Sequence, residues 1–410
     1  MRKEASSLCK GAGPFPLRGG AGLLALILVV FLLVPAIATA IPTDEDPFPD
    51  PNDKPAVKAA SPGEKLIAAA KETIEADPEY PATPEAVEFA LWCYAESGDA
   101  KDLEVAESFL GRLPDRDGPE TEGRFRSFLQ VAWARGEVEG IAAREDLMAS
   151  ASPMARMQAA LLGAVKRDDD TGIKKALAGL QQELERFRTE YEPHEGNPLQ
   201  MVPFPDRFLD YLQAGTLAAE VSGSKDLLND LLTLAQDPVN NFFLRRRSTM
   251  HIRDGFRGAR MLWTLGTMAG DADLREFAEG ILAERLPEAT RAYFRKDRGI
   301  GNPELVPAAA LAVARIERHP VQMVLLGDPE DPTLTALRRA CVALFEPRKI
   351  LINLDPARDA ERIETLMYPA ELAPALFVCV ESVCSAPITD PAKVEATVKE
   401  ILAATRGQEP

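Results

Sequence analysis

The sequence has few of the residues that usually carry out redox or metal chemistry. Its 410 residues include five cysteines, without a Cys-x-x-Cys pair, and three histidines: His194, His251 and His319. Thioredoxin-type redox catalysis uses that cysteine spacing at a helix start, where the thiolate is stabilised, so we do not expect a redox enzyme. Zinc requires about four ligands. Only His319 and Cys341 accompany the cysteines at 379 and 384, so we expect neither a metal nor a cofactor.

Basic residues are scarce relative to acidic ones. Lys and Arg number 47 against 64 Asp and Glu, which gives a net charge of −17. Residues 1–40 hold four basic residues and one acidic residue, so the rest of the chain carries −20. Such a surface repels phosphate backbones, so we expect no nucleic acid among the partners.

The first forty residues predict export. Four basic residues precede an uncharged apolar run from Ala21 to Val34, and Ala38-Thr39-Ala40 is a small-x-small cleavage pattern. An uncleaved anchor is the alternative to a signal peptide, because residues 21–41 contain no charge and are just long enough to span a bilayer. In both cases the basic flank stays inside, so the body of the protein reaches the periplasmic or extracellular side.

The rest of the chain divides into three segments. Residues 41–60 are rich in Pro and Asp, which is typical of an extended, solvated linker. Residues 61–318 lack the alternating pattern of strands, whereas residues 319–410 contain short apolar runs between helical patterns. A single core rarely grows beyond about 250–300 residues. We therefore expect an all-helical domain over 61–318 and a small α/β domain over 319–410.

Apolar residues recur at three- and four-residue steps throughout 61–318, which predicts about eleven to thirteen amphipathic helices joined as antiparallel hairpins. Three similar turns support the hairpins: Ser97-Gly-Asp99, Ser222-Gly-Ser224 and Ala269-Gly-Asp271. In each, the glycine ends one helix in a left-handed conformation and the next polar residue caps the following helix. The irregular spacing of the turns argues against a strict solenoid. A closed α/α toroid fits better, with an irregular α-solenoid as the alternative, and the family resemblance given below decides for the toroid.

Three apolar runs near the C-terminus predict strands: Val321–Leu326, Lys349–Leu354 and Ala375–Val380. Helical patterns separate them, and Asp331-Pro332 and Asp390-Pro391 are favourable helix starts because Asp caps and Pro loses no useful N–H. The alternation of strand and helix predicts a small three-stranded parallel sheet covered by helices.

Cys379 and Cys384 are a candidate disulfide. Cys379 lies in the third apolar run, and four residues separate it from Cys384. In an exported protein the two thiols can bond if the chain turns back between them. The alternative is two separate thiols that fill apolar space.

Two motifs carry a family resemblance. Leu325-Leu-Gly-Asp-Pro-Glu-Asp-Pro332 comes first, and Leu376-Phe-Val-Cys379 follows, with Cys384, Pro387 and Thr389-Asp-Pro391 after it. Together they resemble the C-terminal part of a family of thioredoxin-domain proteins that includes the spermatogenesis-associated thioredoxin-like proteins. The resemblance implies a helical toroid, similar to sugar epimerases and six-hairpin glycosidases, followed by a small α/β end. This chain lacks the family's thioredoxin domain, and Arg253-Asp-Gly-Phe256 stands where the family resemblance implies Ser-Gly-Asn-Ser.

Two sets of residues are candidates for a site. The resemblance to epimerases, which transfer protons with histidines, makes His194 and His251 candidate catalytic residues. Arg253, Arg257 and Arg260 follow at four- and three-residue steps, so they share one helix face and are candidates to bind an acidic or sugar-derived ligand. The alternative for these arginines is internal ion pairing with the excess Asp and Glu.

We therefore expect an exported, non-catalytic binding or scaffolding protein whose partner is an unknown protein or a carbohydrate, attached to the membrane if the apolar run is kept. One alternative is a carbohydrate-active enzyme, either an epimerase or a glycoside hydrolase, that acts in the toroid mouth with paired titratable groups. Another is a helical-repeat protein that binds other proteins along an open groove.

Overall fold

The computed structural model describes residues 61–77, 79–113, 119–138, 151–191, 205–236, 249–294 and 305–406. Ala59–Pro410 forms one compact unit. The expected signal or anchor over 1–40 and the linker over 41–60 lie outside the described residues, as does His194. Within the described ranges, no helix combines the length and the apolar character that a membrane crossing requires.

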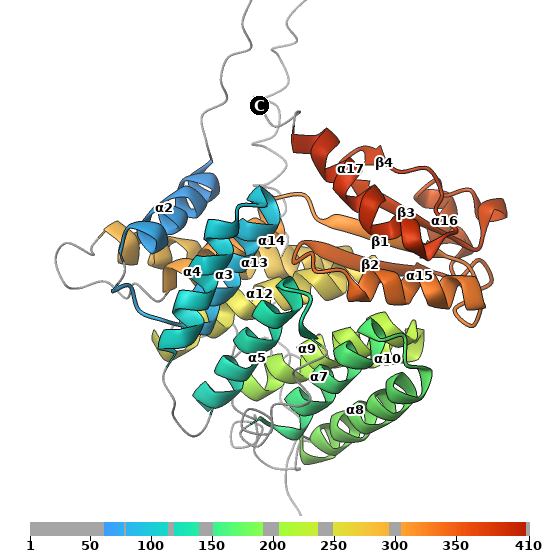
Figure 1. Cartoon of the computed structure of the whole chain (residues 1–410), viewed down its shortest axis with the longest axis horizontal. Coiled ribbons are helices and arrows are strands. Elements are labelled where there is room, and N and C mark those ends of the chain that lie inside the picture. Colours follow the sequence, from blue (N-terminus) through green and yellow to red (C-terminus); the bar gives the residue numbers. More distant parts are fainter. Residues whose placement is uncertain are drawn as a thin grey trace, which may run out of the picture. The chain divides into compact units, whose positions relative to one another are not determined.

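Eleven α-helices occupy the described residues before the first strand (Figure 1). They are α2 (Pro62–Ala76), α3 (Pro84–Ser97), α4 (Ala100–Arg112), α5 (Pro119–Ala134), α7 (Pro153–Lys166), α8 (Asp170–Tyr191), α9 (Pro205–Ser222), α10 (Lys225–Ala235), α12 (Thr249–Ala269), α13 (Ala272–Phe294) and α14 (Leu305–Glu317). The expected helical body is confirmed. Its closure into a toroid stays a prediction, because the connections over 139–150, 192–204, 237–248 and 295–304 lie outside the described residues.

The three repeated turns end and begin helices as predicted. Gly98, Gly223 and Gly270 have φ angles of 71°, 68° and 77°, in the left-handed region that glycine tolerates best. The side chains of Asp99 and Ser224 then accept hydrogen bonds from the first turns of α4 and α10. These turns join α3 to α4, α9 to α10 and α12 to α13, and each pair packs together.

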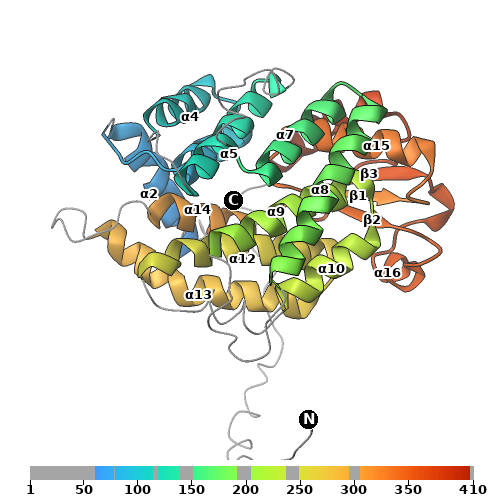
Figure 2. The same cartoon turned by 90° about the horizontal axis from the view of Figure 1, so that it is seen from below.

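Helix α14 lies at the centre of one part of the helical core. Every residue from Leu305 to Ala314 is buried, as expected for a helix that is apolar all round. It packs against α2, α3, α12 and α13 (Figures 1 and 2). Because α3 and α12 both pack on α14, this helix brings together two segments that lie far apart in the sequence.

The chain ends in a small sheet. Its strands are β1 (Val321–Leu326), β2 (Lys349–Leu354), β3 (Ala375–Val380) and β4 (Val383–Cys384), in the order β2-β1-β3-β4. The expected fold class, mainly helical with a small α/β end, is confirmed, and β1 and β2 are parallel. However, β3 runs antiparallel to β1, so the prediction of three parallel strands is wrong in this detail.

The connection between β2 and β3 explains the reversal. A parallel crossover must carry the chain back along the length of a strand, usually with a long helix. Here the connection contains α16 (Ala360–Thr365), of six residues, and the short 3₁₀ helix η3 (Ala370–Leu372). The chain therefore enters β3 beside the end of β1, where Ala375 pairs with Leu326.

The sheet and the helical body share a continuous core. Helix α15 (Pro332–Ala343) packs on β1 and β3 and also contacts α7 and α9, while β2 contacts α12. The last helix, α17 (Val394–Arg406), follows the 3₁₀ helix η4 (Pro391–Lys393) and packs on β3. Buried side chains from α5 through α13 and from every strand except β4 belong to one apolar cluster.

Candidate functional site

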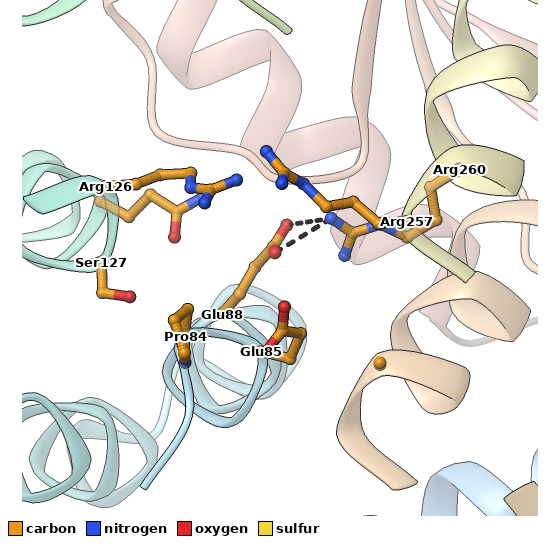
Figure 3. A pocket seen from close by; sticks show the side chains of 9 residues that line it. Pro84, Glu85, Glu88, Arg126, Ser127, Arg257 and Arg260 are labelled. Carbon is orange, nitrogen blue, oxygen red and sulfur yellow. Dashed lines mark hydrogen bonds and ion pairs between the residues drawn. The ribbon is translucent and has the colours of Figure 1, made fainter. Parts of the chain in front are cut away.

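One pocket collects charged side chains from three helices (Figure 3). Its volume is about 340 Å³ when the solvent at its mouth is counted, and the interior alone has room for about one water molecule. Helix α3 supplies Pro84, Glu85 and Glu88, α5 supplies Arg126, Ser127 and Gln130, α12 supplies Arg257 and Arg260, and α14 supplies Ala308. The polar members stand three residues apart in α3 and in α12, whereas in α5 Arg126 and Ser127 are adjacent and Gln130 follows one turn later.

Glu88 and Arg260 form the central ion pair of the pocket. Nη2 of Arg260 donates to both carboxylate oxygens of Glu88, at 2.8 and 2.9 Å. Burial raises the cost of the charged carboxylate, but Arg260, supported by Arg126 and Arg257, outweighs that cost and lowers the pKa of Glu88. Glu88 is therefore ionised near neutral pH.

Arg126 and Arg257 meet over a carboxylate from α9. Arg257 forms an ion pair with Asp210 and donates to Oε1 of Gln213 at 3.2 Å. Nη1 of Arg126 lies 3.2 Å from the same Asp210 oxygen and donates to Gln213 at 3.4 Å. Burial opposes the charge on Asp210, yet Arg257 and Arg126 outweigh it and lower the pKa of its carboxyl. The carboxylate of Asp210 thus holds the positive charges of Arg126 and Arg257 next to each other.

The charges around the pocket balance when Asp210 is counted. Three guanidinium groups, from Arg126, Arg257 and Arg260, face the two carboxylates of Glu85 and Glu88. Figure 3 shows Arg126 reaching in from one side and the two α12 arginines from the other, with Glu88 between them. Asp210 is not part of the lining. It pairs with Arg126 and Arg257, however, so three carboxylates balance the three guanidinium groups.

The structure brings together two of the three predicted arginines. Arg257 and Arg260 line the pocket, whereas Arg253 is not part of its lining and lies 3.9 Å from Glu85. Each of the three arginines faces a carboxylate, so the alternative of internal ion pairing also describes them. The backbone of His251 belongs to the first turn of α12, but its side chain lies outside the described residues.

Sequence reasoning missed Arg126, Glu88 and Asp210. Glu85 and Glu88 stand three residues apart on a helix whose middle, Phe89 to Cys93, is apolar, which is a detectable signal in the sequence. Arg126 gives no comparable signal, because α5 meets α12 through tertiary packing that helical periodicity does not encode.

The cysteines near the C-terminus form a disulfide between Cys379 and Cys384. The two residues are direct partners in the antiparallel pairing of β3 and β4, with Cα atoms 4.1 Å apart. His319 lies 3.3 Å from Glu381 at the surface, while Cys341 is buried. In the described part of the chain, no three His, Cys, Asp or Glu side chains are grouped so as to hold a metal ion.

No protein-family model matches the chain, and no curated protein matches it. The resemblance to thioredoxin-domain proteins therefore stays a prediction.

Proposed function

We propose that this chain is an exported, non-catalytic binding protein that holds a small anionic ligand in the pocket between α3, α5 and α12. The observation that carries the proposal is the convergence of Arg126, Arg257 and Arg260 on one pocket. Guanidinium groups bind carboxylates through paired, charge-assisted hydrogen bonds. Their own ion pairs fix the guanidinium groups in place, so little side-chain entropy is lost when a ligand arrives.

Isothermal titration of the purified protein tests this proposal. The ligands are glucuronate and cyclohexanecarboxylate, which are anions, and glucose, which is neutral. We expect saturable binding of an acid and none of glucose. Arg126→Gln should weaken the binding about tenfold, because one charge-assisted contact is lost.

Arg135→Gln is the matched control, since Arg135 follows the end of α5 and pairs with Glu107 at the surface. Acid binding by Arg126→Gln that equals the wild type, or no acid binding by the wild type, overturns the proposal.

A carbohydrate-active enzyme is the alternative to this proposal, and the protonation state of Glu88 bears on it. A sugar-processing site needs one protonated and one ionised group facing the substrate. The lowered pKa of Glu88 makes it the ionised group of such a pair near neutral pH and excludes it only as the proton donor. NMR spectra of the same samples, recorded over time, show whether the sugar is converted into a product. Turnover of a sugar that Glu88→Gln or His251→Ala abolishes would establish the alternative, a carbohydrate-active enzyme.

Export rests on the basic flank, apolar run and small-x-small pattern within residues 1–41. Mass measurement of the protein recovered outside the cytoplasm tests it. A chain that begins at residue 41 supports a cleaved signal peptide, and a full-length chain in the membrane fraction supports an anchor. Full-length protein in the cytoplasm contradicts export.

A further inference from the structure

The stretch from Leu366 to Pro374, which joins α16 to β3, is apolar and yet lies at the surface. It reads Leu-Met-Tyr-Pro-Ala-Glu-Leu-Ala-Pro, with Glu371 as its only charged residue, and none of its residues is buried. Leu366, Met367 and Leu372 are 44%, 87% and 43% exposed, and no other large apolar residue in the described part of the chain is so exposed. Exposed apolar residues that are gathered in one place, rather than scattered, indicate an interaction site.

Met367 is held in a conformation that the fold leaves uncompensated. Its φ of 57° lies in the left-handed region, which is unfavourable for a residue with a Cβ. Because its side chain is almost fully exposed, packing contacts do not offset this strain. Uncompensated backbone outliers cluster at functional sites, and the flexible, polarisable side chain of methionine suits a surface that adapts to a partner.

The stretch is fixed to the rest of the molecule. Tyr368 donates from its N–H to the carbonyl of Ile363 at 3.1 Å, and its ring packs on Phe377 of β3, with the ring centres 5.2 Å apart. On α16, Nη1 of Arg362 donates to the carbonyl of Met268 at 2.9 Å. The apolar side chains are therefore displayed on a backbone held in place, so little conformational entropy is lost when a partner binds.

Carboxylates outnumber cations around this stretch. Glu361, Glu364 and Glu371 are exposed, and none of the three forms an ion pair with another described residue. The remaining charges nearby are paired or turned inward: Arg358 with Asp355, Lys225 with Asp359, and Arg362 with carbonyls of α12. Even when Arg275 is counted, whose charge acts on Arg362, five carboxylates face four cations. The charges that a partner meets first are therefore negative.

We propose that this surface, Leu366–Pro374 together with Glu361 and Glu364, binds a segment of another protein that carries both apolar and basic side chains. The apolar side chains of the segment cover Leu366, Met367 and Leu372, and its Lys or Arg side chains face the glutamates around them. A second copy of this acidic chain, or an anionic lipid surface, brings like charge against those glutamates. The surface is separate from the pocket, so the inference goes beyond the proposed anion binding and does not rest on it.

Three short synthetic peptides test the two properties of the partner. Their compositions are leucine with lysine, leucine with glutamate, and serine with lysine, in one helical pattern. Fluorescence anisotropy of the labelled peptides with the purified protein measures binding. We expect saturable binding of the leucine–lysine peptide and none of the leucine–glutamate peptide. The serine–lysine peptide, which has the charge without the apolar side chains, should bind at least about tenfold more weakly.

Variants of Met367 locate the binding without endangering the fold. Met367→Gly and Met367→Asn both suit the left-handed conformation and remove the apolar side chain, so we expect each to weaken binding of the leucine–lysine peptide about tenfold. Met367→Leu keeps an apolar side chain in the same conformation and should bind as the wild type does.

A second pair of variants tests the charge. Glu364→Gln should weaken binding about threefold at low salt and less at high salt, because exposed charges are screened. Glu72→Gln is the matched control: Glu72 is exposed on α2, which lies on the opposite side of the molecule from α16 in both views (Figures 1 and 2). It should leave the binding unchanged.

Each remaining outcome overturns the inference. These outcomes are no binding of the leucine–lysine peptide, equal binding by Met367→Gly and the wild type, and equal binding of the lysine and glutamate peptides. A dimer in sedimentation that Met367→Gly abolishes would make a second copy the occupant. Co-sedimentation with phosphatidylglycerol vesicles that the same variant abolishes would make it a lipid surface. Arg126→Gln should bind the peptide normally, so failure here is distinguishable from failure of the proposed function.

Discussion

Nζ of Lys349 lies 4.5 Å from the centre of the Trp133 ring. The same ammonium group donates to the carbonyl oxygens of Cys341, Val342 and Leu344, at 2.8, 2.9 and 2.7 Å. Nε1 of Trp133 donates to the carbonyl of the remaining residue, Ala343, at 3.0 Å. Two side chains, from β2 and from α5, thus satisfy four successive carbonyls at the C-terminal end of α15, where a helix leaves such groups unpaired.

Replacement of Lys349 tests how much this cap stabilises the fold. Lys349→Met removes three hydrogen bonds and leaves buried carbonyls unpaired, so we expect the free energy of unfolding to fall by about 3–5 kcal/mol. Urea denaturation followed by circular dichroism measures it. Lys399→Met is the control, because Lys399 forms an exposed pair with Glu395 and its loss should change stability little. Equal effects of the two changes would contradict the capping role.

The pH dependence of stability gives a second test of Lys349. Burial lowers its pKa to about 8, against the opposing effects of Glu220, Cys341 and Glu346. Between that value and an unfolded value near 10.5, the unfolded chain holds a proton that the folded chain has released. Stability from this group therefore rises with pH across the window, by up to about 1.4 kcal/mol per pH unit. Denaturation at pH 7, 8, 9 and 10 should show this rise in the wild type and not in Lys349→Met.

The central ion pair of the pocket should behave as a coupled unit. Glu88→Leu and Arg260→Met each leave one charged side chain without its partner. We expect each to lower the free energy of unfolding by about 2–3 kcal/mol, a range reduced because both side chains are partly exposed. The double variant should lose less free energy of unfolding than the two single variants lose together, and the difference, the coupling energy, should be about 1–2 kcal/mol. Denaturation of the four proteins in the cycle measures it. Strict additivity would show that the two side chains do not stabilise each other.

Met367 offers a stabilising substitution. It follows α16 with a φ of 57°, and its neighbour Tyr368 donates from N–H to the carbonyl of Ile363, as in a helix end that favours glycine. Its side chain is 87% exposed, so few contacts are lost on truncation. We expect Met367→Gly to raise the free energy of unfolding by about 0.5–1 kcal/mol. Leu366→Gly, at a φ of −84°, should instead lower it. Destabilisation by Met367→Gly would show that this conformation is not strained.

The sequence predicts local features better than long-range ones. The turn at Gly98 and Asp99 was predictable because the signal, a flexible residue followed by a cap, lies in two neighbouring positions. The direction of β3 was not, because it depends on how far the short connection through α16 carries the chain. Helical spacing placed Arg257 and Arg260 on one face. Their meeting with Arg126 depends on how α5, α9 and α12 pack, which no single helix encodes.

The shared core between the sheet and the helices also bears on how such a protein can evolve. The end of α15 relies on Trp133, which lies more than two hundred residues earlier in the chain. Recombination of genes at the boundary near residue 318 would separate that indole from the carbonyl it serves, and would expose the apolar face that α15 presents to α7 and α9. The C-terminal part is therefore poorly suited to transfer into another protein on its own, and we expect the two parts to be inherited together.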